Sequence, residues 1–457
     1  MRSFPCAVAL GLFAASAFGA DGADGWAFDA GADLRIRQEI MHNVPGLPGG
    51  GLLSTAPYGK TRNHVRFRPR VWAELRGGEH WRLYARVTDE FRWNIRPRNH
   101  STTFPDEAIL DNLYLDATGL FDGAFDFRIG RQDLYGLYGL DHVFVDGTPG
   151  DGSRTTYADV VRAAWHATDV SRLDVFALYD ADRNNVRWGT QRGRLKSMSG
   201  LGGGADLEMD DWGWGAIWSS ELHPVLPYRL FAMQKNTSSF HRRGEKHPRT
   251  QRNLFGAILS PRLTDELSLR LEGMGQVGEN GRDESIAAWS AYAGADWKAV
   301  TEDEVRPFAS LGAHVMSGDR DAAEQDGGRR AWDPMWARGV NDSELFLYGT
   351  HYGAAWWSNM MFLKATVGAD LGRLHRVVAS TGPMFAETKD GLGGGDGTYK
   401  GLLSQIRYDF PLIRADRGKG ERFELFGHLL AEFFNPGDYF ATDRPSWFVR
   451  WQVDFKF

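Results

Sequence analysis

Residues 63–94 read NHVRFRPRVWAELRGGEHWRLYARVTDEFRWN and alternate between polar and apolar side chains. Most even-numbered positions carry arginine, glutamate or another polar residue, and most odd-numbered positions carry valine, leucine, phenylalanine or tryptophan. A period of two over this length predicts two β-strands, with the pair of glycines at positions 77 and 78 marking the turn between them. An arginine ladder on one face and aromatic residues on the other favour a membrane barrel, with lipid outside and a charged lumen inside.

The beginning of the chain agrees with export to a membrane. Residues 1–20 combine the basic Arg2, a short apolar core and small residues before Asp21, which is the pattern of a cleaved signal peptide. The single cysteine, Cys6, lies in this segment, so the mature chain is expected to form no disulfide. Residues 21–457 show no linker and predict one barrel domain. The whole chain carries 17 Trp, 28 Phe and 55 Gly, which fits aromatic girdles and glycine-rich strands. The net charge of −6 gives no support to nucleic-acid binding.

Alternating segments recur along the chain, joined by alternately long and short connections. They predict an all-β fold, a transmembrane antiparallel β-barrel of about 18 strands in the bacterial outer membrane. A large soluble β-domain is the alternative. The first predicted strand is Trp26–Met41, and later ones include Leu345–Trp357 and Met360–Leu371, followed by a loop over Gly372–Tyr399. The last strand alternates up to the terminal Phe457, which we expect the barrel-assembly machinery to bind.

Several short motifs resemble the alginate-export porin family. They are Tyr114-Leu-Asp, the run from Phe127 to Leu134 (FRIGRQDL), the run from Arg154 to Arg162 (RTTYADVVR), Ser317-Gly-Asp, Trp332-Asp-Pro and the run from Phe434 to Tyr439 (FNPGDY). The resemblance implies an outer-membrane barrel, typically of 18 strands, with an electropositive pore for an anionic polysaccharide. The strand before the PGD turn departs from the alginate-secreting porin, since it offers His428 and Glu432 where that porin brings arginines into the pore.

Arginines on the polar faces are the candidates for the solute path, because a guanidinium can hold a carboxylate through two parallel hydrogen bonds. The alternative for each is a structural role in an arginine–carboxylate network that fills the lumen. Arg131 falls on the lipid face if the strand is regular, so its candidacy requires a bulge at Gly130; otherwise it lies at the membrane interface. The candidates are Arg35, Arg37, Arg68, Arg70, Arg86, Arg128 and Arg131.

The hairpin register sorts these arginines further. A three-residue turn over residues 77–79 keeps the polar faces together, whereas a two-residue turn would invert them. This register places Glu74 opposite Arg82 and Arg66 opposite Glu90, so both pairs are predicted to be structural. It also places Arg70 opposite Arg86 and Arg68 opposite Thr88, so these three arginines would find no carboxylate on the hairpin.

The predicted function is a channel for an anionic solute, most strongly an acidic oligo- or polysaccharide such as alginate. The alternatives are an uptake porin for small organic acids or sugars, and a barrel-anchored surface protein whose long loops bind glycan. We expect no enzyme activity, cofactor or metal site, although the acidic glycine-rich segments 146–152 and 317–326 leave Ca²⁺ binding open. The expected partners are outer-membrane lipid, the anionic saccharide, the assembly machinery and a periplasmic protein.

Overall fold

The computed structural model describes most of the barrel and part of its connections. The described residues are 20–21, 25–44, 61–96, 98, 101, 104, 108–133, 137–140, 143–144, 157–180, 187–188, 210–242, 245–281, 284–320, 329–336, 342–346, 358–372, 374–391, 393–416, 422–441 and 443–456. The predicted signal peptide, apart from Ala20, and the terminal Phe457 lie outside them.

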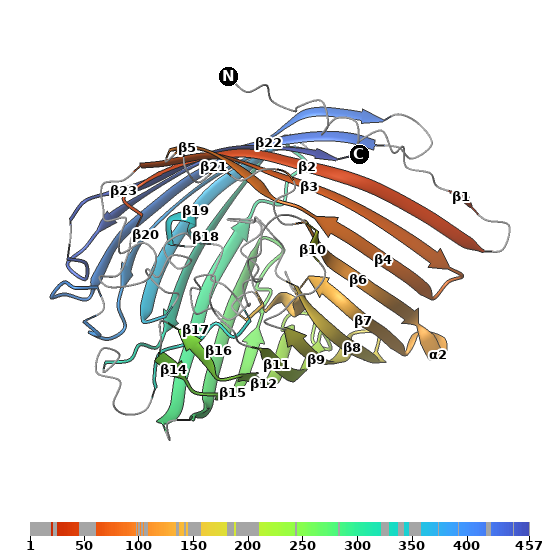
Figure 1. Ribbon diagram of the computed structural model, residues 1–457, viewed down its shortest axis with the longest axis horizontal. Coiled ribbons are helices and arrows are strands. Elements are labelled where there is room, and N and C mark those ends of the chain that lie inside the picture. The colour runs from red at the N-terminus through yellow and green to blue at the C-terminus, as the bar shows by residue number, and fades with distance from the viewer. Residues whose placement is uncertain are drawn as a thin grey trace.

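The chain forms one closed antiparallel barrel of 18 strands, counting β4 and β5 as one interrupted strand, which confirms the predicted fold class (Figure 1). In order around the wall the strands are β2 (Trp26–His42), β3 (Thr61–Gly77), β4 (Trp81–Thr88) with β5 (Phe91–Arg96), β6 (Ala108–Gly119), β7 (Phe125–Asp133), β8 (Tyr157–Thr168), β9 (Ser171–Asp180), β11 (Asp211–Ser220), β12 (Tyr228–Thr237), β15 (Thr250–Leu259), β16 (Leu267–Asn280), β17 (Glu284–Lys298), β18 (Val305–Met316), β19 (Met360–Leu371), β20 (His375–Phe385), β21 (Tyr399–Asp416), β22 (Arg422–Pro436) and β23 (Ser446–Lys456).

The smaller elements lie at the two ends of the wall. Strand β1 (Ala20–Asp21) pairs with β2, β10 (Arg187–Trp188) pairs with β6, and β13 (Phe240–Arg242) forms a hairpin with β14 (Glu245–His247). A short helical turn, α2 (Leu120–Gly123), joins β6 to β7, and a 3-10 turn, η4 (Leu137–Gly139), follows β7.

The barrel closes where the first and last strands of the wall pair. In Figure 1 the red strand β2 lies among the blue strands at the end of the chain, and β23 is its hydrogen-bonded neighbour. Ile40 lies opposite Val449, and Arg37 lies opposite Gln452. Closure leaves no unpaired strand edge, as a sheet surrounded by lipid requires.

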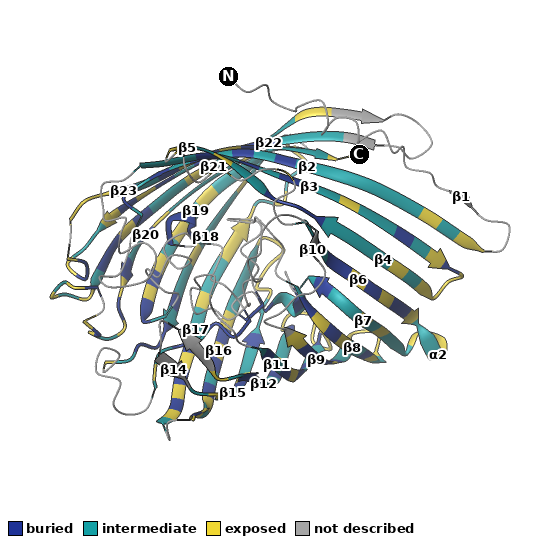
Figure 2. Cartoon of the chain, viewed as in Figure 1, coloured by how far each residue is buried: buried dark blue, intermediate teal, exposed yellow. Residues whose placement is uncertain are grey.

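The outer surface of the wall is apolar and the inner surface is buried. Figure 2 shows exposed and buried residues alternating along the strands, and the exposed ones include Val71, Val449 and Trp451. Among the described residues, no helix is long and apolar enough to cross a membrane.

The barrel interior is divided into an apolar side and a charged side. On β8, β9, β11, β12 and β15 the inward residues are mainly apolar, and loop residues such as Phe144 and Trp336 pack against them. The rings of Phe144 and Trp336 stack with centroids 5.3 Å apart, and Trp336 meets Phe176 of β9 edge to face at 5.9 Å. The charged side lies on β22, β23, β2 and β3, where arginine and glutamate side chains are buried.

Two predicted elements between residues 345 and 399 are wrong. The predicted strand Leu345–Trp357 begins as a helical turn at residues 344–346, and the remainder, 347–357, lies outside the described residues. Leu345 and Phe346 are buried inside the barrel, so an apolar loop segment imitates the composition of a strand. The predicted loop Gly372–Tyr399 contains β20, whose Gly382 and Pro383 resemble turn residues. The β19–β20 pairing is interrupted at these two residues, as expected beside a proline that has no N–H to donate.

Closure in this register can be tested by cross-linking. Ile40→Cys together with Val449→Cys should form a disulfide on oxidation, because directly opposed residues of an antiparallel pair lie within disulfide range. The linked chain should migrate differently from its reduced form on a boiled gel. The control pair Ile40→Cys with Val453→Cys shares the same face, but Val453 lies opposite Ile36, so it should link poorly. Efficient linking of the control pair alone would contradict the register.

Candidate functional site

Six arginines converge on the inner face of three adjacent strands at the closure of the barrel. We call this group the arginine seam; its members are Arg35 and Arg37 on β2, Arg66, Arg68 and Arg70 on β3, and Arg450 on β23. Arg35 lies directly opposite Arg68, and Arg37 directly opposite Arg66. Like charges that face each other across a sheet repel unless anionic groups compensate them, so the seam depends on its carboxylates.

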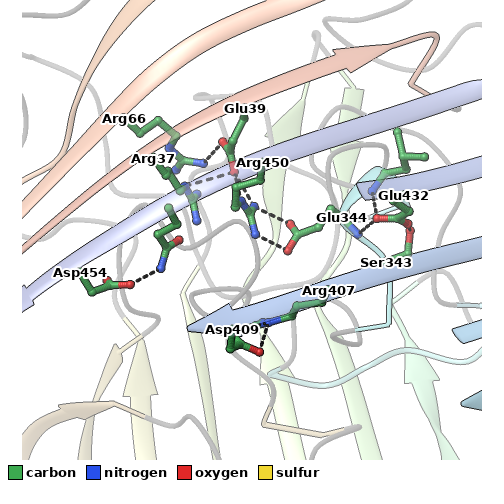
Figure 3. Close-up of polar contacts among 12 residues, drawn as sticks. Arg37, Glu39, Arg66, Ser343, Glu344, Arg407, Asp409, Glu432, Arg450 and Asp454 are labelled. Atoms are coloured by element: carbon green, nitrogen blue, oxygen red, sulfur yellow. Dashed lines mark hydrogen bonds and ion pairs between the residues drawn. The ribbon is translucent and has the colours of Figure 1, made fainter. Parts of the chain in front are cut away.

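Glu39 is the central carboxylate of the seam (Figure 3). It is fully buried and lies 3.1 Å from Arg37 Nε and 3.3 Å from Arg66 Nη1, and it also accepts hydrogen bonds from Arg450. His64 lies 3.0 Å from its second oxygen. One carboxylate therefore serves three guanidinium groups, and its removal would leave buried charges without compensation.

The remaining seam carboxylates come from the neighbouring strands and turns. Glu90, between β4 and β5, accepts hydrogen bonds of 2.7 and 3.0 Å from Arg66. Asp33 lies 3.7 Å from Arg68 Nη2, which is longer than a hydrogen bond, and directly opposite Arg70 in the sheet. Arg68 is thus held less tightly by Asp33 than Arg66 is by Glu90.

The predicted hairpin register is wrong by two residues. The turn occupies residues 78–80 instead of 77–79, so Glu74 lies opposite Tyr84 and Arg70 opposite Thr88. Because the shift is even, the polar faces still coincide. Arg82 reaches Glu74 diagonally, at 2.6 Å from Nε to Oε2.

Arg86 and Arg128 lie inside the barrel, but each is engaged by carboxylates on neighbouring strands. Arg86 lies opposite Trp72 and not opposite Arg70, and it donates to Asp111 of β6 at 2.7 and 3.0 Å and to Asp133 of β7 at 2.9 Å, both outside the hairpin. Arg128 binds Asp116 at 2.5 and 2.9 Å and covers the ring of Tyr114. The hairpin alone could not reveal these partners, which come from β6 and β7.

Arg131 does not lie in the lumen. The pairing of β7 with β6 and β8 runs without a bulge through Gly130, so Arg131 faces outward opposite the exposed Leu113. There it forms an ion pair with Asp159 at 3.0 Å and covers the ring of Tyr157. Gly130 has a φ of +126° and packs against the backbone carbonyl of Leu113, which explains the glycine without a bulge.

Two described parts of the connection between β18 and β19 lie inside the barrel and reach the two sides of its interior. We call these parts, residues 329–336 and 342–346, the inner loop. On the apolar side, Lys235 of β12 donates to the carbonyl of Met335 at 2.6 Å, and Gln276 of β16 donates to the carbonyl of Asp333 at 2.6 Å. Burial would raise the pKa of the Asp333 carboxyl, but nearby Arg252 and Lys235 hold it below its usual range. Asp333 therefore remains an ionised anchor of the loop.

On the charged side the inner loop binds β22 and β23 (Figure 3). Glu432 of β22 accepts hydrogen bonds from the Ser343 hydroxyl and from the backbone N–H of Glu344 at 2.8 Å. Arg450 of β23 binds the Glu344 carboxylate through two hydrogen bonds of 2.6 and 2.9 Å. β12 and β23 are separated by about half the circumference in strand order, so the two described parts of the inner loop contact opposite sides of the lumen.

Sequence reasoning missed Arg450, Glu39 and Glu344 as members of the site. The alternation of the last strand places Arg450 on its polar face, and this signal alone could have added it to the candidates. The closing pair β2–β23 and the fold of the inner loop are long-range features that a local pattern does not specify. Among the described residues, no cluster of acidic, histidine or cysteine side chains could hold a metal ion.

Comparison with known families identifies part of the chain. Residues 29–199 match the family described as alginate export, which confirms the resemblance drawn from the motifs. The matched segment includes β2 and most of the other strands that carry the predicted arginines. No curated protein matches the chain.

Solved outer-membrane porins share the fold. OccK8 (OprE) of Pseudomonas aeruginosa is 10% identical with a TM-score of 0.55, over 94% of this chain and 98% of that chain. OccAB2 of Acinetobacter baumannii is 10% identical with a TM-score of 0.51, over 94% and 98%. OccK2 (OpdF) of P. aeruginosa, in complex with glucuronate, is 11% identical with a TM-score of 0.52, over 93% and 97%. The chain therefore has the fold of a bacterial outer-membrane porin barrel, in agreement with the predicted location in the outer membrane.

The contacts predict different consequences for Arg86 and Arg68. Arg86→Gln should lower the free energy of unfolding by about 3 kcal/mol, because it leaves the buried Asp111 without its cation. Arg68→Gln should cost less than about 1 kcal/mol, since its carboxylate lies beyond hydrogen-bond distance. Urea unfolding of the barrel in lipid vesicles, followed by tryptophan fluorescence, measures both. Equal losses would mean that Arg86 has no special structural role.

Proposed function

We propose that this channel conducts anionic solutes along the arginine seam, with acidic oligo- or polysaccharides as its preferred class. The observation that carries the proposal is the direct opposition of Arg35 to Arg68 on the inner face of β2 and β3, since the neighbouring pair of Arg37 and Arg66 is already compensated by Glu39. Cross-strand pairs of like charge are unfavourable on their own, and an anion between them makes them favourable.

The chemistry of arginine suits a saccharide that bears carboxylates. Its planar fork holds a carboxylate through two parallel hydrogen bonds, and it remains charged at any physiological pH. A row of such groups raises the local concentration of anions in the lumen. Conduction also requires that each site be weak enough to release the solute to the next. Arg68, whose contact with Asp33 is longer than a hydrogen bond, meets that requirement better than Arg66 does.

The comparisons support the saccharide class without fixing the solute. The alginate-export match covers β2 and β3, which hold five of the six seam arginines. Glucuronate is the molecule named in the OccK2 complex, and it is the monomer type of a polyuronate, which makes it a suitable probe here.

A second candidate function is uptake of small organic acids or sugars. The inner loop favours it, because a segment anchored to Gln276 on one side and to Arg450 on the other crosses the path of a long polymer. Both candidates use the same arginine seam and differ in the size of solute that passes. A comparison of monomeric and oligomeric uronates in transport through proteoliposomes separates them.

Replacement of two neighbouring arginines of the seam on β3 tests anion conduction. Arg68→Ser combined with Arg70→Ser should reduce chloride-over-potassium selectivity in planar bilayers. It should also raise the half-blocking concentration of glucuronate by about tenfold, the equivalent of one lost charge-assisted hydrogen bond. The barrel should still assemble and shift its gel migration on boiling.

Arg131→Ser is the matched control, because it removes one guanidinium from the outer surface of the same barrel. It should leave both selectivity and glucuronate block unchanged. A wild-type channel without anion selectivity and without block by uronates would refute the proposal outright.

A further inference from the structure

We propose that Arg450 is a carboxylate-binding subsite that Glu344 of the inner loop occupies until a solute carboxylate replaces it. The inference rests on the proposed conduction of anionic solutes and adds the position at which a solute must compete with the protein itself. In the empty channel, the Glu344 carboxylate occupies the position that a solute carboxylate would take.

The geometry of the Arg450–Glu344 pair is that of a bound carboxylate ligand. Nη1 of Arg450 donates to Oε1 of Glu344 at 2.6 Å, and Nη2 donates to Oε2 at 2.9 Å, so the two groups meet fork to fork (Figure 3). This is the arrangement in which arginine recognises free carboxylates. The guanidinium is buried, with 1% of its side chain exposed, so the pair is strengthened by its low-dielectric surroundings.

Glu344 differs from the other seam carboxylates because it does not belong to the barrel wall. Glu39 lies on β2 and pairs with Arg37, Arg66 and Arg450 at once. Glu344 is delivered by the inner loop, and a neighbouring loop carboxylate, Asp342, instead binds Lys364 of β19 at 2.6 Å. When Glu344 leaves, Arg450 shares the single charge of Glu39 with two further arginines, and the vacated position needs an anion.

The contacts that hold the inner loop on β22 allow the Glu344 carboxylate to leave Arg450 without movement of the loop backbone. Glu432 accepts hydrogen bonds from the backbone of Glu344 and from the hydroxyl of Ser343, and Phe346 packs edge to face on Phe434 with centroids 4.9 Å apart. These contacts hold the backbone on β22 and do not involve the Glu344 carboxylate. Rotation of the Glu344 side chain therefore frees the Arg450 guanidinium for a solute carboxylate.

Competition by Glu344 selects for solutes with several carboxylates. A monocarboxylate that competes with Glu344 comes directly from bulk solution. A polyuronate already held at Arg68 or Arg70 instead presents its next carboxylate to Arg450 at a high local concentration. The subsite thereby favours acidic oligosaccharides over small acids of the same charge type.

Single-channel recording of the full-length barrel with glucuronate and with trigalacturonate tests the inference. Glu344→Gln should lower the half-blocking concentration of glucuronate by about tenfold, because the competing charge is gone. The ratio of glucuronate to trigalacturonate half-blocking concentrations should fall, since the monomer gains most. Arg450→Lys keeps the charge but loses the fork, and it should raise the half-blocking concentration of both probes.

Asp342→Asn removes a carboxylate from the same loop but not from the arginine seam, and it should leave block by both probes unchanged. If Glu344→Gln or Arg450→Lys is blocked at the same concentrations as the wild type, the proposed subsite at Arg450 is refuted. The proposed anion conduction still holds in that case if Arg68→Ser with Arg70→Ser weakens block. Absence of block and of anion selectivity in the wild type would instead refute the proposed function. If Glu344→Gln fails to assemble, the Arg450→Lys measurement alone tests the proposed subsite.

Discussion

The hydrogen-bonded pairing of β23 with β2 is the constraint on which the structure depends. In lipid, every backbone N–H and C=O of a wall must be satisfied within the wall, so the last strand must pair with the first. In the register that achieves this, Glu39 lies opposite both Arg450 and His64. Closure therefore creates the arginine seam, because it brings residues more than 400 positions apart into one charge cluster.

The division of the interior follows from what each side can pack against. Inward apolar residues on β9 and β11 can be buried only by other apolar groups, and loop residues such as Phe144 and Trp336 supply them. Inward arginines need carboxylates and water instead. Loop residues consequently cover the apolar side of the lumen. The inner loop meets the charged side through Ser343 and Glu344 and also through Phe346, which packs on Phe434.

Local periodicity in the sequence was sufficient to predict most of the strands and the face of most arginines. The strand number agrees because one false strand, at 345–357, offsets the missed β20. Local periodicity failed where the same local pattern can arise in two ways. An apolar segment can be a strand or a loop inserted into the barrel, and Leu345 and Phe346 belong to such a loop. An arginine can face the lumen after a bulge or face outward in a regular strand, and Arg131 faces outward after Ile129. The partners of Arg86 lie on β6 and β7, beyond the reach of a hairpin argument. The hairpin register was predicted correctly as to which residues share a face, but it was wrong by two residues. Burial determines the face of each residue, whereas it does not determine the position of the turn.

The carboxylates of the seam explain how one set of arginines can be both structural and functional. A guanidinium fully matched by wall carboxylates, such as Arg66 with Glu39 and Glu90, stabilises the barrel and has little left to offer a solute. A guanidinium with no carboxylate would destabilise the empty channel. Arg450 lies between these limits, because part of its positive charge is balanced by the carboxylate of Glu344 on the inner loop, which a solute carboxylate can replace. The empty channel then remains stable, and the solute binds at the point where the protein gives up a carboxylate of its own.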